Sequence, residues 1–228
     1  MMMIRSFWTI TLCLLLLFPG PLLAANPAGK VTAMQGSVWA RSGDYPERNL
    51  HRGDRIYSGD RIRTGSGASV TLLFEDKSSF DLGPSADMVV GKYIFNPGKE
   101  SSFTSRIVKG AFRFLSGLIA KHRPKAMSVQ LSVATIGIRG TYVAGVVEPD
   151  SAKVMLLQPE KAHPTAIEVY NDYGSVVVDK PGYGTEIPDA HSPPSPVRRM
   201  KLRTINNIMR SLQSIQRIRP PAPRIHMH

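Results

Sequence analysis

The sequence predicts an all-β body, solenoid-like or roll-like, followed by a C-terminal amphipathic basic helix. Three observations predict the body. The first two are short segments of alternating apolar and polar residues, and frequent turn signals built from Gly, Pro, Asn and Asp. A third is a pair of six-residue units at residues 53–58 and 59–64, which both begin with Gly-Asp and carry Ile at the fourth position. The body shows no long apolar period of 3.6 residues, so long helices are not expected there.

The Gly-Asp units are predicted to be tight turns that lead into very short strands. Gly53 and Gly59 permit a positive φ angle, and the Asp that follows each can accept hydrogen bonds from backbone N–H groups two residues further on. Ile56 and Ile62 are expected to point to the same side of successive strands. The chain would therefore coil or double back every few residues.

Short strands are predicted along the rest of the body. They lie at residues 30–41 (two strands that meet at 35–36), 68–74, 79–82, 88–90, 92–95, 102–108, 111–115, 129–133, 134–143, 144–147, 153–157, 166–170, 175–179 and 184–187. Residues 115–125 are basic and are interrupted by Pro124, which leaves a loop or one helical turn as alternatives. Many short strands at regular spacing favour the all-β class.

Residues 1–25 are predicted to be a signal peptide. Arg5 precedes an apolar run at residues 7–18, and cleavage is expected near Ala24 or Ala25, with an uncleaved N-terminal anchor as the alternative. Cys13 is the only cysteine, so the cleaved protein would have no disulfide, thiol nucleophile or cysteine-based metal site. An exported chain without disulfides fits a periplasmic or secreted protein of a Gram-negative-type bacterial envelope.

The net charge of +12 is unevenly distributed, because residues 191–228 contribute +8 and residues 26–190 only +3. The prediction divides the chain after residue 25 into an all-β domain (26–190), a Pro-rich linker (191–196), an amphipathic basic helix (197–219) and a disordered tail (220–228). A basic tail on an exported chain favours an anionic envelope surface as a partner, and nucleic acid is not expected.

The predicted tail helix has an apolar stripe and a basic face. Arginines on the basic face are candidate contacts to a partner or an anion: Arg199, Arg203, Arg210 and Arg217. Three alternatives are open for the helix. It could cap an open end of the β-body, lie on an anionic membrane, or bind a partner protein in a groove.

A set of motifs follows in a fixed order over roughly residues 30–190. They include Gly36-Ser37-Val38, the Gly59-Asp60 unit with Gly65, the strand at 68–74, and Lys109-Gly110-Ala111. The segment Val133-Ala134-Thr135-Ile136-Gly137-Ile138-Arg139-Gly140-Thr141 closes the set. Together these motifs resemble the FecR domain family. The last segment is similar to the family's closing motif, with Ile136 where the family usually has Pro.

The resemblance implies a periplasmic all-β domain, often solenoid-like, that takes part in envelope signalling. In its namesake setting this domain belongs to a membrane regulator that passes an outer-membrane iron-uptake signal to a sigma or anti-sigma factor. That regulator also has a cytoplasmic helical segment, one membrane span and a receptor-contacting domain. A chain that begins with a signal peptide and ends with a basic helix is instead expected to be a free-standing secreted member.

No catalytic or cofactor site is predicted. The six histidines lack a zinc-binding spacing, and no phosphate loop or hydrolase elbow is found, so we expect no enzyme activity, metal or cofactor. Arg139 is a candidate partner or anion contact, although a structural role beside a bend at Gly140 is the favoured alternative. Trp39 and Tyr57 could belong to a sugar-binding surface, but packing is the commoner role of such residues.

The sequence thus predicts a non-enzymatic periplasmic FecR-like interaction or scaffold module that binds a partner protein or envelope polymer. The alternative is a peripheral membrane or cell-wall-anchored protein that is tethered by its basic C-terminal helix.

Overall fold

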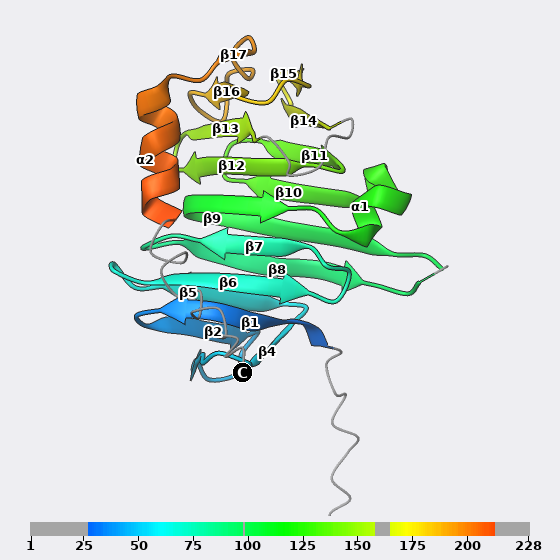
Figure 1. The fold of residues 1–228 in the computed structure, drawn as a ribbon, viewed down its shortest axis with the longest axis vertical. Helices are drawn as coiled ribbons and strands as arrows, with labels where there is room; N and C mark the ends of the chain where they lie inside the picture. Colours follow the sequence, from blue (N-terminus) through cyan, green and yellow to red (C-terminus); the bar gives the residue numbers. More distant parts are fainter. Residues whose placement is uncertain (1–26, 98, 158–164, 213–228) are drawn as a thin grey trace, which may run out of the picture.

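The computed structural model describes residues 27–97, 99–157 and 165–212, and these residues form two facing β-sheets (Figure 1). Sheet A contains, in spatial order, β4 (Arg55–Tyr57), β1 (Pro27–Gln35), β6 (Ser69–Phe74), β7 (Ser79–Leu82), the second part of β9 (Ser102–Leu115), β12 (Tyr142–Val147), β13 (Ala152–Leu156), β16 (Tyr183–Ile187) and β17 (Arg198–Arg199). Sheet B contains β3 (Arg48–Asn49), β2 (Val38–Ser42), β5 (Asp60–Thr64), β8 (Asp87–Ile94), the first part of β9, β10 (Met127–Leu131), β11 (Thr135–Arg139), β14 (Ala166–Asn171) and β15 (Gly174–Val178). The predicted all-β class is confirmed.

The longest strand, β9, belongs to both sheets because it bends at Gly110. Lys109 pairs with Asp87 in sheet B, whereas Gly110 pairs with Val147 in sheet A. Gly110 has a φ angle of 103°, and a Cβ at this position would lie 2.6 Å from the Cα of Ala86. Only glycine satisfies both the angle and the close backbone approach. This bend explains the Lys109-Gly110 step of the sequence.

The core lies between the two sheets and is built from the side chains that point inward from the strands of both sheets. Its centre is a cluster of phenylalanines with Tyr93, in which Phe74 and Phe103 have ring centroids 4.5 Å apart and Phe80 and Phe114 4.4 Å apart. These rings come from β6, β7, β8 and both parts of β9. The cluster therefore joins sheet A to sheet B.

The Gly-Asp units form tight turns as predicted, but their details differ. Gly53 and Gly59 have positive φ angles of 95° and 91°. The carboxylate of Asp60 accepts a hydrogen bond from the N–H of Tyr57 at 2.9 Å, three residues earlier rather than two residues on. Ile56 and Ile62 are both fully buried, yet they lie in β4 of sheet A and β5 of sheet B. The turn at Gly59 thus carries the chain between sheets, which makes the body roll-like.

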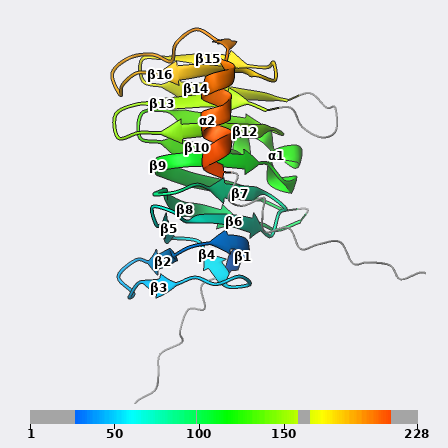
Figure 2. The ribbon, with the colours of Figure 1, turned by 60° about the vertical axis from the view of Figure 1, so that its left-hand side comes forward.

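The C-terminal helix, α2 (Leu202–Leu212), lies across the outer face of sheet A (Figures 1 and 2). Ile208 and Leu212 are buried against a platform that includes Ala111, Ala144 and Met155. Its basic face, with Arg203 and Arg210, is exposed. The helix therefore covers a sheet face and does not cap an end of the body.

The predicted start of the helix at residue 197 is wrong. Arg198 and Arg199 instead form β17, which pairs with β16, and the N–H of Met200 donates to the carbonyl of Gly182 at 2.9 Å. Strand pairing therefore delays the helix to Leu202. The predicted continuation to residue 219, the tail at 220–228, the signal peptide at 1–25 and Arg217 lie outside the described residues.

The predicted Pro-rich linker packs on the end of the stack. The side-chain amide of Asn171 donates to the carbonyl of Ser192 at 2.7 Å, and the hydroxyl of Thr185 donates to the carbonyl of Ser195 at 2.6 Å. Pro194 is buried. This segment, rather than the helix, covers the end formed by β15 and β16. None of the described helices has the length and apolar character needed to span a bilayer.

Candidate functional site

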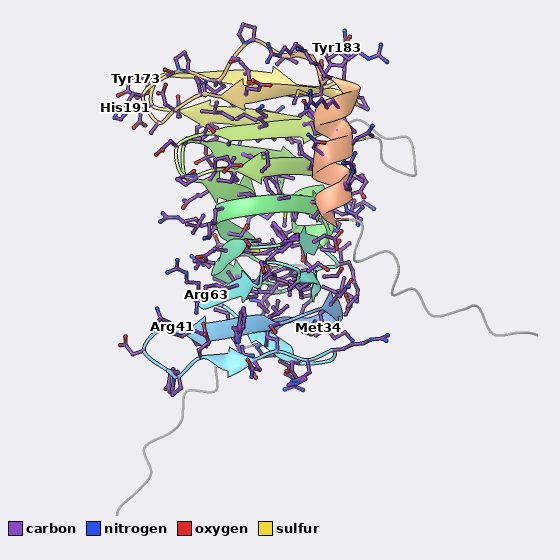
Figure 3. All side chains as sticks on the ribbon, turned by 90° about the vertical axis from the view of Figure 1, so that its left-hand side faces the viewer. Met34, Arg41, Arg63, Tyr173, Tyr183 and His191 are labelled. Atoms are coloured by element: carbon purple, nitrogen blue, oxygen red, sulfur yellow. The ribbon has the colours of Figure 1, made fainter. Side chains whose placement is uncertain are left out.

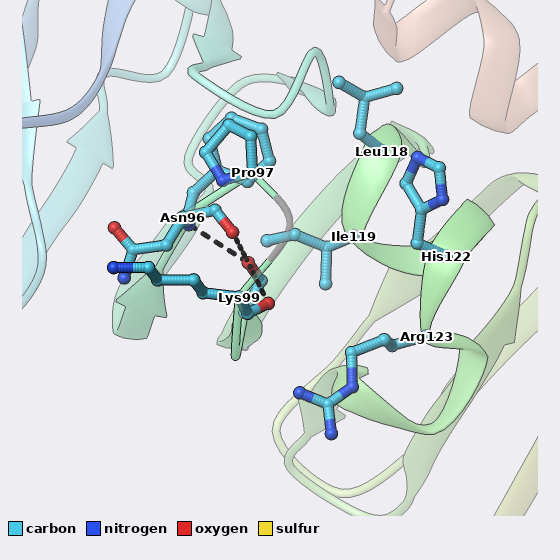
Figure 4. Close-up of a pocket in the computed structure, with 9 residues that line it drawn as sticks. Asn96, Pro97, Lys99, Leu118, Ile119, His122 and Arg123 are labelled. Atoms are coloured by element: carbon cyan, nitrogen blue, oxygen red, sulfur yellow. Dashed lines mark hydrogen bonds between the residues drawn. The ribbon is translucent and has the colours of Figure 1, made fainter.

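The best candidate site is a groove between the β8–β9 turn and the short helix α1 (Leu118–His122), shown in Figure 4. The groove has a volume of about 330 Å³. Its lining residues come from the turn on one side and from the helix on the other: Phe95, Asn96, Pro97, Lys99, Ser101, Leu118, Ile119, His122 and Arg123. A concave apolar surface with a few polar groups is the usual form of a binding site.

Helix α1 is held in place by the turn between β6 and β7. The carboxylate of Asp76 accepts hydrogen bonds from the hydroxyl of Ser78 at 2.7 Å and from the N–H of Ile119 at 3.3 Å, and the Asp76 carbonyl accepts from the N–H of Leu118 at 2.7 Å. Asp76 is fully buried. A Cβ on Gly117 would lie 2.2 Å from the Asp76 carbonyl oxygen, so glycine is required where the chain enters the helix.

The opposite wall of the groove is fixed by Ser101 and by Tyr93. The hydroxyl of Ser101 accepts from the N–H of Asn96 at 3.0 Å and lies 3.1 Å from the Asn96 carbonyl, to which it donates. The hydroxyl of Tyr93 accepts from the N–H of Asp76 at 2.8 Å, which ties β8 to the turn that holds α1. Burial, and then the nearby Asp76 carboxylate, raises the pKa of Tyr93 well above its usual value. Both walls are therefore connected through Asp76.

The groove combines an apolar floor with a basic rim. The apolar lining residues are Phe95, Pro97, Leu118 and Ile119. Ile119 is buried and Phe95 is half-buried, so they form the floor, whereas Pro97 and Leu118 are exposed at its edge. Lys99, the helix residue His122 and Arg123, which directly follows the helix, supply the rim, and no lining residue is acidic. Lys121 and Lys125 add exposed positive charge nearby. The site can thus take an apolar side chain that stands beside an anionic group. Among the described residues no cluster of His, Cys, Asp and Glu could hold a metal ion.

Residues 60–159 match a family model described as FecR protein. The resemblance to the FecR family is confirmed. The FecR match extends from the start of β5 past the end of β13, so it contains both walls of the groove, α1 and Asp76. The strands before β5, helix α2 and β14–β17 lie outside it.

Two crystal structures of a proposed anti-sigma factor from Parabacteroides distasonis ATCC 8503 are similar to the chain, each with 11% sequence identity and a TM-score of 0.49. The alignments cover 65% of this chain and 64% and 63% of those chains, so this chain spans less than two thirds of their length. No curated protein matches the chain.

The arginines predicted as contacts do not gather at one place. Arg139 is exposed at the end of β11 and forms no ion pair with the described residues; the bend that follows it has Gly140 at a φ angle of 63°. Thr141 donates its N–H to the hydroxyl of Ser116, just before α1, at 2.7 Å. Arg139 therefore ends its strand on the α1 side of the segment that matches the FecR model.

Arg199, Arg203 and Arg210 lie on β17 and α2, on the opposite side of the stack from α1 (Figure 1). Arg199 lines a hollow at the start of α2, in which Glu186 forms an ion pair with Arg198 at 2.9 Å. Arg203 and Arg210 are simply exposed on the helix. The structure thus separates these arginines from Arg139.

Trp39 and Tyr57 do not share a surface suited to a sugar. Trp39 lies on β2 of sheet B and Tyr57 on β4 of sheet A, and both are half-buried. The guanidinium carbon of Arg48 lies 5.6 Å from the Tyr57 ring centroid, so this ring already packs against a cation.

Sequence reasoning missed the groove and the role of Asp76. The basic run at residues 115–125 was a visible signal, and one of its two alternatives, a helical turn, is what forms: α1 is followed by a short 3₁₀ turn, η1 (Pro124–Ala126). Asp76 lies between the predicted strands at 68–74 and 79–82, where a charged side chain is usually exposed, yet it is fully buried. Only the three-dimensional packing of Gly117 against Asp76 shows that Asp76 holds α1 in place.

Proposed function

We propose that this protein is a non-enzymatic FecR-like interaction module of bacterial envelope signalling, and that a partner protein binds in the groove at α1. The observation that carries the proposal is the apolar floor with its acid-free basic rim, set within the segment that matches FecR. Sequence adds support for the location, because residues 1–25 have the pattern of a signal peptide for export to the periplasm or beyond.

The chemistry of the groove selects a partner segment that carries a large apolar side chain next to Asp or Glu. Burial of a Leu or Phe side chain contributes about 1.5–3 kcal/mol. Exposed ion pairs with Lys99 and Arg123 would each contribute about 0–1 kcal/mol. The apolar contact would therefore provide most of the affinity, and the charges would mainly provide orientation and speed of association.

Tethering by α2 is the alternative function, and the packing of the helix argues against it. Membrane binding needs the apolar face of the helix, but Ile208 and Leu212 are buried on sheet A. The described part of α2 would have to leave the sheet before it could enter a bilayer. The exposed arginines alone give a weak, salt-sensitive contact.

The proposal is tested with synthetic peptides of matched length that carry Leu or Phe next to Glu, next to Gln or next to Lys. We expect saturable binding of the acidic apolar peptides, measured by titration calorimetry, and a loss of about tenfold with Leu118→Ser. Arg123→Gln is expected to weaken binding about threefold at low salt and less at physiological salt, where the Debye length is about 8 Å.

Leu115→Ser is the matched control, because Leu115 is 44 % exposed and lies three residues before Leu118 but does not line the groove. Equal losses for Leu115→Ser and Leu118→Ser would contradict the assignment of the groove. Equal binding of the Glu, Gln and Lys peptides would contradict the proposed charge preference.

A further inference from the structure

Four outward-facing side chains form a compact group where β2 pairs with β5 on sheet B. Arg41 lies directly opposite Arg61, and Trp39 lies directly opposite Arg63. The residues between them, Ala40 and Ile62, point into the core. Figure 3 shows Arg41 and Arg63 close together, on the side of the stack away from α2. Three guanidinium groups thus share one face of two adjacent strands.

Two carboxylates hold two of these guanidinium groups in place. Arg61 contacts Asp87 through Nε at 2.9 Å and through Nη2 at 2.6 Å, and Asp87 is only 5 % exposed. This hydrogen bonding raises the pKa of Arg61 above its usual value. Arg63 forms an ion pair with Glu47, which comes from the loop between β2 and β3. An arginine side chain whose guanidinium group is already oriented loses little rotamer entropy when a ligand binds.

Positive charge exceeds negative charge on this part of sheet B. Arg41 is exposed and forms no ion pair within the described part of the chain, although it faces Arg61. Like charges directly opposite each other on a sheet are destabilising. The excess continues along the face, because Arg106 pairs with Val89, which in turn pairs with Arg61. A bound anion would relieve the repulsion between Arg41 and Arg61.

The arginines surround a hollow of about 110 Å³ that is lined by Arg41, Glu47, Arg61 and Arg63. We propose that this hollow is a binding site for a tetrahedral oxyanion, namely the phosphate or sulfate group of an envelope molecule. Arginine forks match the oxygen geometry of phosphate with paired hydrogen bonds. This site is independent of the groove at α1, which lies at another part of the body and has an apolar floor.

The Glu47 carboxylate would compete with a bound anion for Arg63. Its side chain is 34 % exposed, so it can move away from Arg63, whereas Asp87 is held in the sheet. An incoming oxyanion would take the place of the Glu47 carboxylate on Arg63. Removal of the negative charge of Glu47 should therefore strengthen anion binding, whereas a change that merely disturbs the loop would weaken it.

The test uses the chain from Asn26 onward, in which Trp39 is the only tryptophan and reports on the site through its fluorescence. It is titrated with inorganic phosphate, with sulfate, and with vesicles of phosphatidylglycerol or phosphatidylcholine. We expect saturable binding of phosphate or sulfate, a loss of about tenfold with Arg41→Gln, and a gain of several-fold with Glu47→Gln. Arg41→Lys keeps the charge but not the fork, and should show an intermediate loss.

Arg203→Gln is the matched control, because it removes one exposed positive charge from α2, on the other side of the stack. Arg41-dependent binding of phosphatidylglycerol vesicles assigns the oxyanion to a lipid headgroup, and Arg41-dependent binding of free anions alone assigns it to a soluble phosphate or sulfate group. The proposal is overturned if no anion saturates, if Arg41→Gln behaves like Arg203→Gln, or if Glu47→Gln weakens binding. Unchanged thermal unfolding of each variant shows that the fold is intact.

Discussion

The outer faces of the two sheets differ, although their inner faces are alike. On sheet A, small and apolar residues such as Ala111, Ala144 and Met155 form a platform that α2 covers. On sheet B, one row across the strands runs through Arg61, Val89, Arg106, Gln130, Thr135 and Tyr170. Arg61, Arg106 and Tyr170 on that row are exposed, and the cluster that contains α2 lies on the other sheet.

This difference shows that the inward-facing and outward-facing side chains of a strand have separate roles. Most inward residues of both sheets are apolar and build one core, although Asp60, Thr64 and Ser105 are buried among them. The outward residues decide what each face can do, since an apolar platform binds a helix and a charged one stays in contact with water. The apolar residues of α2 form a hydrophobic cluster with sheet A that is separate from the main core. The packing of α2 can therefore be broken without opening the core.

The largest expected effect comes from a charge placed beneath the helix. Ala144 is fully buried under α2, so Ala144→Glu should detach the helix and destabilise the protein by about 2–4 kcal/mol. The loss is limited because the main core remains closed. Circular dichroism and urea unfolding measure it. Thr135→Glu, in the open row of sheet B, should change stability by about 0.5 kcal/mol or less, and an equal loss there would contradict the contrast between the faces.

A smaller effect is expected from the helix itself. Ile208 is 3 % exposed, and Ile208→Ala should cost about 2 kcal/mol, at the low end of buried truncations because the helix can adjust. Val177→Ala, at a position on sheet B that is 56 % exposed, should cost about 0.5 kcal/mol or less. Thermal unfolding of both variants tests the prediction, and a larger loss for Val177→Ala would mean that sheet B is covered.

The smallest effect concerns Tyr93, which leaves both outer faces unchanged. Tyr93→Phe removes the acceptor for the Asp76 N–H and should cost about 1 kcal/mol at neutral pH. Because burial raises the pKa of Tyr93 above its usual value of 10.0, the folded state favours the neutral phenol. Its contribution is complete below pH 10 and is lost as the pH rises further. The wild type should therefore lose more stability above pH 10 than Tyr93→Phe does, and parallel curves would argue against this role.

Much of the fold was predictable from the sequence, because local chemistry determines it. Alternation gave the all-β class, and Gly53 and Gly59 marked turns whose φ angles are positive. The helix start at residue 197 was wrong, since the spacing of apolar residues cannot reveal that Arg198 and Arg199 pair with β16. Nor could spacing show that α2 lies on a sheet face.

The candidate site was largely beyond sequence reasoning. Its walls come from residues 95–101 and 118–123, and the buried residue that positions them, Asp76, lies in a third segment. No local pattern joins three such segments. The charge of the predicted arginines indicated possible contacts but not their positions in the fold. The structure distributes these arginines over both sides of the stack.

The most direct test of the central claim is a methyl NMR titration of the protein with an acidic apolar peptide. We expect the shifts to concentrate at Leu118 and Ile119 in the groove, and the methyl signals of Ile205 and Ile208 to stay unchanged. The contradicting result would be shifts at Ile205 and Ile208 with none at Leu118, because the peptide would then replace α2 on sheet A and the partner surface would be the covered face.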